Sequence, residues 1–278
     1  MSGGAADAPA VFSDRSLSQR LERAEGYACA QFAEARRRVF PRSGAEWIEC
    51  AGAYAVFDGP ESPVTQTFGL GIFEEPTPSA LDVIERFFLD RGAPVHHEVS
   101  PFAGVATLDL LCARRYRPVE MSNVMYRPAE KPAAGVDDGR IRVRIIGPGE
   151  AQLWTEINAR GWTHEHPEFL DFLRQTGAIS SARDGSVSFL GEYDGQPAAA
   201  GSLSIHNGVA LFAGAATIPE MRRRGLQAAL LRERMRYAVE AGCDLGMMVA
   251  EAGSNSQRNA ERTGFRVGYT RIKWRLAG

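Results

Sequence analysis

The chain reads PEMRRRGLQAA from Pro219 to Ala229, and this stretch decides how its C-terminal half is interpreted. It follows an apolar run, 209–218, that is typical of a buried strand, and it opens an amphipathic helix. The first turn of a helix leaves backbone N–H groups free, and the helix dipole favours an anion beside them. Gly225 lets a ligand approach the backbone closely, and the three arginines before it add positive charge. The sequence therefore predicts a phosphate-binding turn.

Two common phosphate-binding motifs do not fit this turn. A P-loop requires a Gly-Lys-Ser/Thr sequence and a dinucleotide-binding fingerprint requires two further glycines, and the stretch contains neither. The helix that it opens is predicted to continue to about Glu240, with Gly242 just beyond its end. The ligand must therefore be identified from the elements that follow.

Those elements form a regular succession. Residues 245–249 predict a buried strand, and residues 254–263 predict a short helix. The helix ends in Thr263-Gly264-Phe265, and an alternating strand closes the chain.

The turn and its surroundings resemble the GNAT N-acetyltransferases, whose Arg-x-x-Gly-x-Gly/Ala segment holds the pyrophosphate of acetyl-coenzyme A. Arg222 and Gly225 match that segment, whereas Gln227 stands where a second small residue is usual. The order strand, phosphate turn, helix, strand, short helix, Gly-Phe and strand agrees with the second half of the GNAT fold. The resemblance thus covers the chain from Val209 to its end.

The N-terminal half predicts the same order of elements. We expect helices at 16–39, 79–91 and 104–114, and strands at 51–57, 66–72, 95–99 and 120–126. A segment rich in Pro, Ala and Gly, 127–139, separates the halves. We interpret the chain as an internal repeat of α/β (α+β) class: two GNAT-like domains, each a mixed, mostly antiparallel sheet flanked by helices. The predicted division is a flexible tail at 1–13, a degenerate domain at 14–128, a linker at 129–139 and an acetyl-coenzyme A-binding domain at 140–278.

The N-terminal repeat lacks the phosphate turn. At the corresponding junction the chain reads Phe73-Glu74-Glu75-Pro76, without arginine or glycine. Its two carboxylates would repel a pyrophosphate. We expect this half to bind no coenzyme A, and to pack against the other half.

Composition excludes several other classes of protein. The 278 residues are 44% hydrophobic and 24% charged, which is an ordinary globular profile, and a formal net charge of -2 gives no basic excess for nucleic acid. No apolar stretch approaches the ~18 residues of a membrane span, and the first residues lack the basic start and apolar core of a signal peptide. The cysteines, at positions 29, 50, 112 and 243, have no metal-ligand spacing. We expect a cytoplasmic protein without membrane, nucleic-acid or metal binding and without a disulfide framework.

The resemblance implies which residues hold the cofactor. The pyrophosphate is expected at the backbone of residues 223–229, and the pantetheine in a splay between the strand at 209–218 and the next strand. A backbone N–H among residues 215–217 is implied to polarise the thioester carbonyl. The predicted cofactor-binding residues are Ala215, Ala216, Thr217, Ile218, Arg222, Arg223, Arg224, Gly225, Leu226, Gln227, Ala228, Ser256 and Asn259.

Proton transfer is where the sequence departs from the family. Many members carry a tyrosine four residues before the Gly-Phe, as an acid for the leaving thiolate, and Ala260 stands there in this chain. Asn259, Ser254, Ser256 and Tyr269 are the possible substitutes, of which Asn259 and Tyr269 are predicted as catalytic, although a structural role in the short helix or in the core stays open. Glu251, which follows the strand at 245–249, is the predicted general base.

The acceptor side is predicted from an aromatic and titratable segment, 154–172, where the first helices of the fold cover the acceptor site. Trp162, His164 and Glu165 are its predicted substrate contacts. His164 and His166 have no third ligand nearby, so we expect no zinc site.

These features predict an N-acetyltransferase that transfers an acetyl group from acetyl-coenzyme A to a primary amine of a small molecule by direct attack, as a monomer or homodimer. Two alternatives stay open. One is a non-catalytic protein that binds coenzyme A or acts as a scaffold, which the loss of the tyrosine at Ala260 favours. The other is an acyltransferase that uses a different acyl-coenzyme A.

Overall fold

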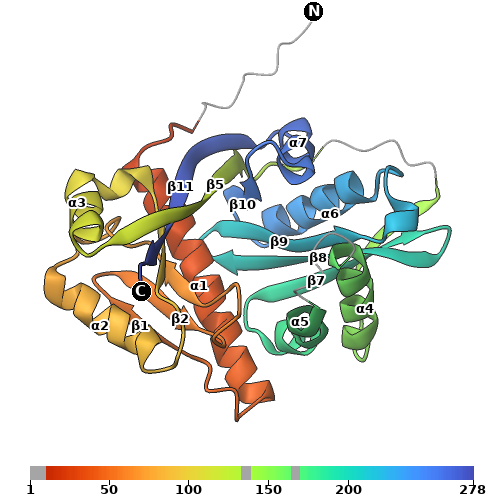
Figure 1. Ribbon diagram of the computed structural model, residues 1–278. Helices are drawn as coiled ribbons and strands as arrows, with labels where there is room; N and C mark the ends of the chain where they lie inside the picture. The colour runs from red at the N-terminus through yellow and green to blue at the C-terminus, as the bar shows by residue number, and fades with distance from the viewer. Residues whose placement is uncertain (1–10, 133–138, 164–169) are drawn as a thin grey trace, which may run out of the picture.

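The computed structural model describes residues 11–132, 139–163 and 170–278. Its centre is one sheet of 11 strands in the order β1-β2-β3-β4-β11-β5-β10-β9-β8-β7-β6 (Figure 1). The β3–β4 and β9–β10 pairs are parallel, and the other neighbours are antiparallel. The strands are β1 (Glu46–Cys50), β2 (Ala53–Phe57), β3 (Gln66–Phe68), β4 (His96–Val99), β5 (Tyr116–Pro128), β6 (Ile141–Ile145), β7 (Ser186–Tyr193), β8 (Gln196–His206), β9 (Val209–Thr217), β10 (Leu245–Glu251) and β11 (Arg266–Leu276).

The two ends of the sheet have the same arrangement of strands when each is followed from its edge towards the middle. One end gives β1-β2-β3-β4-β11, and the other, with β6 left aside, gives β7-β8-β9-β10-β5. In each run the third and fourth strands form the parallel pair. The pairing therefore shows the predicted repeat, and the predicted fold class is confirmed.

The two repeats exchange their last strands. β5 ends the N-terminal repeat, yet it pairs with β10 along 122–128 and with β11 on its other side. β11 ends the chain and lies between β5 and β4. Sequence analysis predicted a linker between two domains and did not anticipate this pairing, which is non-local and leaves no trace in local patterns. The exchange gives each last strand a partner on both sides and joins the repeats in a single sheet.

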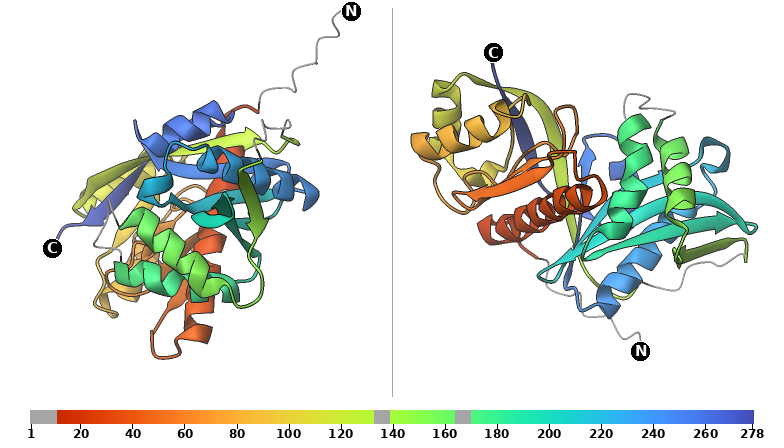
Figure 2. Two further views of the ribbon diagram at one scale, coloured as in Figure 1. Left: turned by 90° about the vertical axis from the view of Figure 1, so that its right-hand side faces the viewer. Right: turned by 90° about the horizontal axis from the view of Figure 1, so that it is seen from below.

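Helices cover both faces of the sheet (Figures 1 and 2). One face carries α1 (Arg15–Val39), α4 (Ala151–Trp162) and α5 (Leu170–Ala182). The other carries α2 (Pro78–Leu89), α3 (Val105–Ala113), α6 (Leu226–Glu240) and α7 (Asn255–Arg262), with the short 3₁₀ turns η1 (Pro101–Ala103) and η3 (Pro219–Met221). The bounds of α1, α2, α3, α6 and α7 agree closely with the predicted helices. β1 was not predicted, and the strand predicted at 66–72 was too long, because β3 ends at Phe68 and a turn follows.

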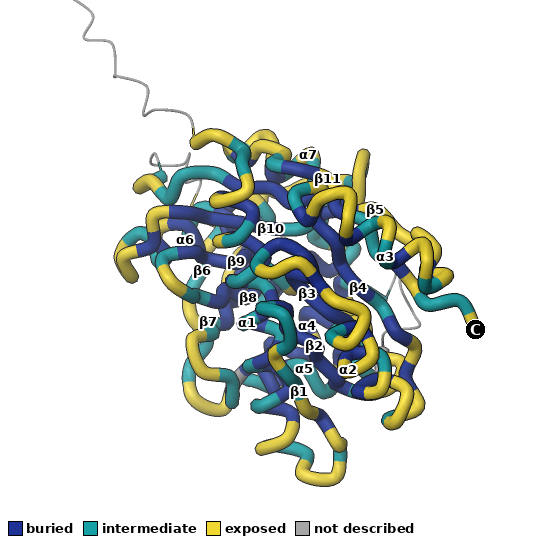
Figure 3. Tube along the Cα trace, turned by 90° about the vertical axis from the view of Figure 1, so that its left-hand side faces the viewer, coloured by how far each residue is buried: buried dark blue, intermediate teal, exposed yellow. Residues whose placement is uncertain are grey.

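Helix α1 packs against both repeats. Asp14 caps its N-terminus by accepting from the Leu17 N–H at 2.9 Å. Its buried stripe includes Leu17 and Leu21, which lie in one cluster with Val124 of β5 and Leu211 of β9. Burial of one such leucine stabilises the fold by about 2 kcal/mol. In the burial-coloured trace the strands beneath the helices are buried and the outer turns are exposed (Figure 3).

Most of the predicted tail and linker lies outside the described residues. Residues 11–13 lie against the sheet, because the Val11 carbonyl accepts from the Tyr126 hydroxyl at 2.6 Å and Ser13 Oγ donates to the Gly268 carbonyl at 2.7 Å. No helix in the described part of the chain is both long and apolar enough to cross a membrane.

Candidate functional site

Strands β9 and β10 pair over three residues and then separate. Residues 209–211 pair with 245–247, although β9 continues to Thr217 and β10 to Glu251. Beyond this point β9 stays paired with β8, and β10 with β5. Within the described chain, the facing edges of β9 and β10 therefore have no strand partner there. This is the splay that the resemblance implied.

A bulge interrupts β9 beside the splay. Ala200 pairs with Ala216 and Ser202 with Ala213, so Gly201 alone stands opposite both Gly214 and Ala215. Gly214 has a φ of +58°, which residues with a side chain rarely adopt, and it is exposed although it lies within a strand. The bulge thus brings polar backbone to solvent at the splay. Sequence analysis did not single out the polar side chains around it, Asn158, Ser202 and Arg234, because none of them stands in a motif.

The predicted phosphate turn lies at the end of β9. Arg223 and Gly225 both have left-handed backbone conformations, with φ of +63° and +87°, and α6 begins at Leu226. Gly225 is the N-cap of α6, and no side chain caps its first turn. Residues 223–225 are exposed, as is Ala228. An anion can therefore reach the free N–H groups of this turn.

The side chains of the turn divide into two groups. Arg222 and Gln227 point back into the protein: Arg222 Nη2 donates to the Gly161 carbonyl at 3.0 Å, and Gln227 Nε2 donates to Thr217 Oγ1 at 2.8 Å. Arg223 and Arg224 are exposed, and the Arg224 guanidinium lies 4.8 Å from the Tyr193 ring centroid. Arg222 thus braces the turn against α4, and its predicted contact with pyrophosphate stays a prediction.

These features fit coenzyme A. A pyrophosphate requires N–H donors and positive charge, which the turn supplies. A pantetheine chain, with its two amides, requires an open strand edge, which the splay supplies. The buried small residue Ala216, with Thr217 and Ile218, continues β9 from one feature to the other.

The predicted residues beyond β10 lie at the far side of the splay. Glu251 is exposed at the end of β10, opposite Ser122 of β5. In α7, Ser256 is exposed and Asn259 is half-buried. Ser254 caps this helix by accepting from the Gln257 N–H at 3.1 Å, a structural role. Ala260, which replaces the family's tyrosine, is fully buried in the core.

Tyr269 belongs to a buried polar cluster beneath α1. Its hydroxyl donates to Glu22 Oε1 at 2.8 Å, and burial raises its pKa well above the usual value. Burial also raises the pKa of Glu22 to about 7, even though the Arg271 guanidinium lies 3.5 Å away. The Tyr269 hydroxyl thus already donates its hydrogen bond to a residue of α1, and its catalytic role stays a prediction.

On the acceptor side, Trp162 is the last residue of α4 and is half-buried. Its neighbour Gly161 lies against β9, where a Cβ atom would come within 2.5 Å of Ala216 Cβ. The end of α4 therefore touches β9 between the bulge and the phosphate turn. His164 and Glu165, like His166, lie outside the described residues.

The corresponding junction of the N-terminal repeat is closed. Thr77 Oγ1 caps α2 by accepting from the Ala80 N–H at 3.1 Å, and Pro78 removes a further N–H from the first turn. Arg15 and Gln19 of α1 donate to the Ile72 carbonyl. Glu74 and Glu75 are exposed, and the expectation that this repeat binds no coenzyme A stays a prediction.

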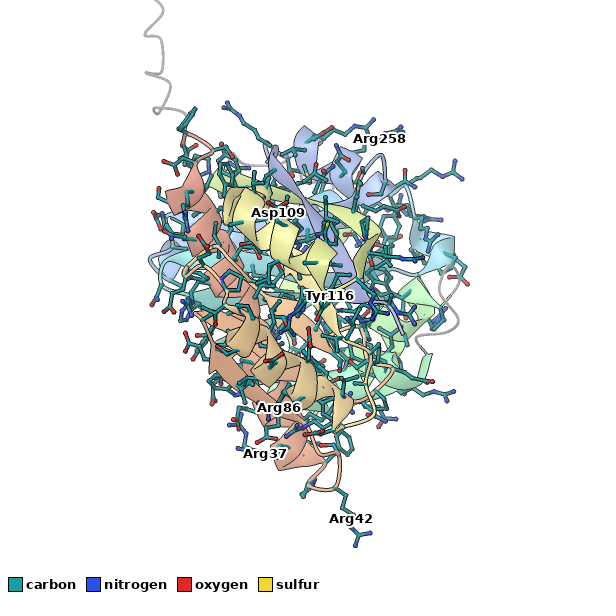
Figure 4. The ribbon with its side chains drawn as sticks, turned by 60° about the vertical axis from the view of Figure 1, so that its left-hand side comes forward. Arg37, Arg42, Arg86, Asp109, Tyr116 and Arg258 are labelled. Carbon is teal, nitrogen blue, oxygen red and sulfur yellow. The ribbon has the colours of Figure 1, made fainter. Side chains whose placement is uncertain are left out.

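A cluster of three polar side chains is formed within this repeat by Tyr116, Glu85 and His97. Tyr116 lies between α2 and α3 (Figure 4), where its hydroxyl donates to Glu85 at 3.0 Å and lies 2.9 Å from His97 Nε2. Burial lowers the pKa of His97 to about 3, so this histidine is neutral. Within the described residues no cluster of three His, Cys, Asp or Glu side chains could hold a metal, and the four cysteines are free.

Comparison with known proteins identifies the C-terminal repeat. Residues 151–265 match the model of the acetyltransferase (GNAT) family, so this part of the chain is a GNAT domain. No curated protein sequence matches the chain.

Solved structures extend the likeness to the whole chain. A GCN5-related N-acetyltransferase from Kribbella flavida has 16% identity and a TM-score of 0.67, with 94% of this chain and 96% of that one covered. A conserved protein of unknown function from Staphylococcus epidermidis has 9% identity and a TM-score of 0.61, covering 86% and 96%. A tandem GNAT protein from the clavulanic acid biosynthesis pathway has 12% identity and a TM-score of 0.54, covering 96% and 98%. At these identities the likeness shows the fold, a tandem of GNAT repeats.

Proposed function

We propose that this chain is an acetyl-coenzyme A-dependent N-acetyltransferase whose C-terminal repeat acetylates a primary amine of a small molecule. GNAT proteins are acyltransferases in general and use acetyl-coenzyme A or coenzyme A. The observation that carries the proposal is the path along β9, from the uncapped turn at Gly225 to the exposed bulge at Gly214. It provides a pyrophosphate site at one end and an open strand edge at the other.

The residues of the path have distinct roles in this proposal. Backbone N–H groups of residues 223–228 bind the pyrophosphate, and Arg223 and Arg224 add positive charge. Bound acetyl-coenzyme A supplies a thioester carbonyl that an amine can attack. A backbone N–H among residues 215–217 stabilises the negative charge that develops on the carbonyl oxygen.

Glu251 accepts the proton that the attacking amine loses. It is exposed at the end of β10, where an amine can approach from solvent. Asn259 of α7 donates to the leaving sulfur. A strong acid is not required there, because a thiol with a pKa of about 8.5 is already a fair leaving group.

A binding protein without catalysis is the second candidate. Ala260 is fully buried where many family members carry a tyrosine, and the Tyr269 hydroxyl already donates to Glu22. A protein that only binds coenzyme A needs neither group.

Incubation of the protein with acetyl-coenzyme A and a panel of primary amines, followed by a free-thiol assay, tests the proposal. Release of free coenzyme A that requires both protein and amine supports the enzyme. Tight binding of acetyl-coenzyme A with no release for any amine supports the binding protein. Mass spectrometry of the copurified thioester identifies the acyl group and so tests the third reading, a different acyl donor.

A further inference from the structure

Side chains from both faces of the sheet hold the bulge in β9. The Ala213 carbonyl accepts from Ser202 Oγ at 3.1 Å and from Arg234 Nη1 at 3.4 Å. The Gly214 carbonyl accepts from Asn158 Nδ2 at 3.0 Å. In a regular ladder, carbonyls accept from the N–H groups of the neighbouring strand. At this bulge, side chains of α4, α6 and β8 also donate to these carbonyls.

Among the side chains that contact the bulge, Arg234 carries the largest free-energy penalty of burial. It is 1% exposed, and no described carboxylate pairs with it. Its other hydrogen-bond acceptors are also carbonyls, those of Leu230 at 3.2 Å and Ser202 at 3.0 Å, and its guanidinium lies 5.2 Å from the Phe212 ring centroid. Burial lowers the pKa of Arg234 to about 9. Because a buried cation without a counter-ion is expensive, an apolar residue would serve better here if α6 needed only to pack on the sheet.

Asn158 approaches from the opposite face. It is 1% exposed, and its Oδ1 has no hydrogen-bond partner among the described residues. Its contact with the Gly214 carbonyl is therefore the polar contact that orients the side chain. A leucine of similar size would avoid the unsatisfied oxygen, so packing alone does not account for asparagine at this position.

The geometry of the peptide bond links these contacts to the splay. The carbonyl of Gly214 and the N–H of Ala215 share one planar trans peptide and point in opposite directions. The same holds for the carbonyl of Ala213 and the N–H of Gly214. Side chains that fix the two carbonyls therefore fix the directions of the two N–H groups beside the splay.

We infer that Asn158 and Arg234 are positioning residues for the Ala215 N–H, which binds the thioester carbonyl oxygen of the substrate: Asn158 holds the Gly214–Ala215 peptide directly, and Arg234 holds the Ala213–Gly214 peptide before it. This inference rests on the proposed function. Loss of one oxyanion donor lowers kcat by about 100- to 1,000-fold, and a donor that is only misdirected loses part of that effect. We expect kcat to fall by about 10- to 100-fold in Asn158→Leu and Arg234→Met, with unchanged affinity for coenzyme A, because the phosphate turn is untouched.

Infrared spectroscopy with acetyl-coenzyme A labelled with ¹³C at the thioester carbonyl tests the inference without an acceptor. In the wild-type protein the labelled carbonyl stretch is expected at lower frequency than in solution, because a hydrogen bond weakens the C=O bond. In Asn158→Leu and Arg234→Met, saturated with the label, most of this shift is expected to disappear. Thr155→Val and Arg236→Met are matched controls: Thr155 Oγ1 bonds only to the Ala151 carbonyl of its own helix, and Arg236 is paired with Glu233 and Glu240 at the surface. Both controls should keep the shift.

The outcomes separate the inference from the proposed function. A wild-type shift that both variants retain in full overturns the positioning role and leaves the proposed function standing. A wild-type protein that does not bind the labelled thioester overturns both. Asn158→Leu removes an unsatisfied buried oxygen and leaves the exposed Gly214 carbonyl to water, so it is expected to fold even if Arg234→Met does not.

Discussion

The strand-to-helix junctions before α2 and α6 occupy equivalent places in the two repeats. They differ in whether the backbone N–H groups of the first helical turn are capped. At the start of α2, Thr77 caps the first turn, Pro78 removes a donor, and Glu74 and Glu75 stand in front. At the start of α6, Gly225 provides no side-chain cap and exposed arginines stand in front. The comparison teaches that a helix start binds an anion only where the chain does not itself satisfy the N–H groups. A few residues, rather than the fold, decide which repeat leaves the start of its helix open to an anion.

The largest effect is expected when the start of α6 receives a negative charge like that of Glu74 and Glu75 before α2. Ala228 is exposed in the first turn of α6, so Ala228→Glu places a carboxylate among the proposed pyrophosphate donors. We expect the Kd for coenzyme A in calorimetry to rise on the order of 1,000-fold, from repulsion by the phosphates. The melting temperature should stay or rise, because an acidic side chain at a helix N-terminus is favourable. Ala228→Gln is the neutral control, and tight binding by Ala228→Glu would place the cofactor elsewhere.

The next effect is a pH dependence of stability that arises in the buried polar cluster of Glu22, Tyr269 and Arg271. Glu22 is buried and its pKa is raised from 4.5 to about 7, so the folded protein binds a proton that the unfolded chain releases between these values. Glu22 therefore makes the free energy of unfolding fall as pH rises from 4.5 to 7, by about 3 kcal/mol, since one pKa unit corresponds to about 1.4 kcal/mol.

Glu22→Gln should remove this part of the pH dependence, because glutamine is neutral throughout and can still accept from Tyr269. Arg271 keeps its ion pairs with Glu25 and Glu98. Urea denaturation at a series of pH values measures the effect. A pH profile in Glu22→Gln as steep as that of the wild type would contradict the assignment.

The third test concerns the general base. In the sequence repeat, Glu251 corresponds to Ser100, whose hydroxyl lies 2.9 Å from that of Ser18. Glu251→Gln removes the proposed base while the phosphate turn stays intact, so we expect kcat to fall by about 100-fold and the affinity for coenzyme A to stay. Steady-state kinetics with an amine found in the panel measures both, with the exposed Glu261→Gln on α7 as control. Unchanged turnover in Glu251→Gln would assign the proton to another group.

The smallest expected effect concerns the N-terminal junction, at the start of α2. The double variant Glu74→Gln, Glu75→Gln removes the repulsive charge of the N-terminal junction but leaves its cap and its proline. We expect neither coenzyme A binding stoichiometry nor turnover to change. A second molecule of coenzyme A bound per chain would show that charge alone had closed this junction.

The sequence predicted the turn at residues 223–225 and the strand β9 before it, but not the contacts around them. Arg223, Gly225 and the small residues of β9 are local signals, because backbone conformation and strand width follow from neighbouring residues. The strand exchange and the contacts of Asn158 with Gly214 join residues far apart in the chain, and no local pattern encodes them. The first arginine of the turn illustrates the limit: Arg222 was predicted from its spacing, but only the structure shows that it bonds to the Gly161 carbonyl.

The position of β11 also bears on how the protein is made. This strand is translated after the other strands of the sheet, yet its place is in the middle of the sheet, between β4 and β5. A nascent chain that has completed its first repeat must therefore keep a place open for residues not yet synthesised, with strand edges exposed to wrong partners. We expect chains shortened before Arg266 to aggregate as a whole, because β4 of the N-terminal repeat lacks its neighbour on one side until β11 has been synthesised.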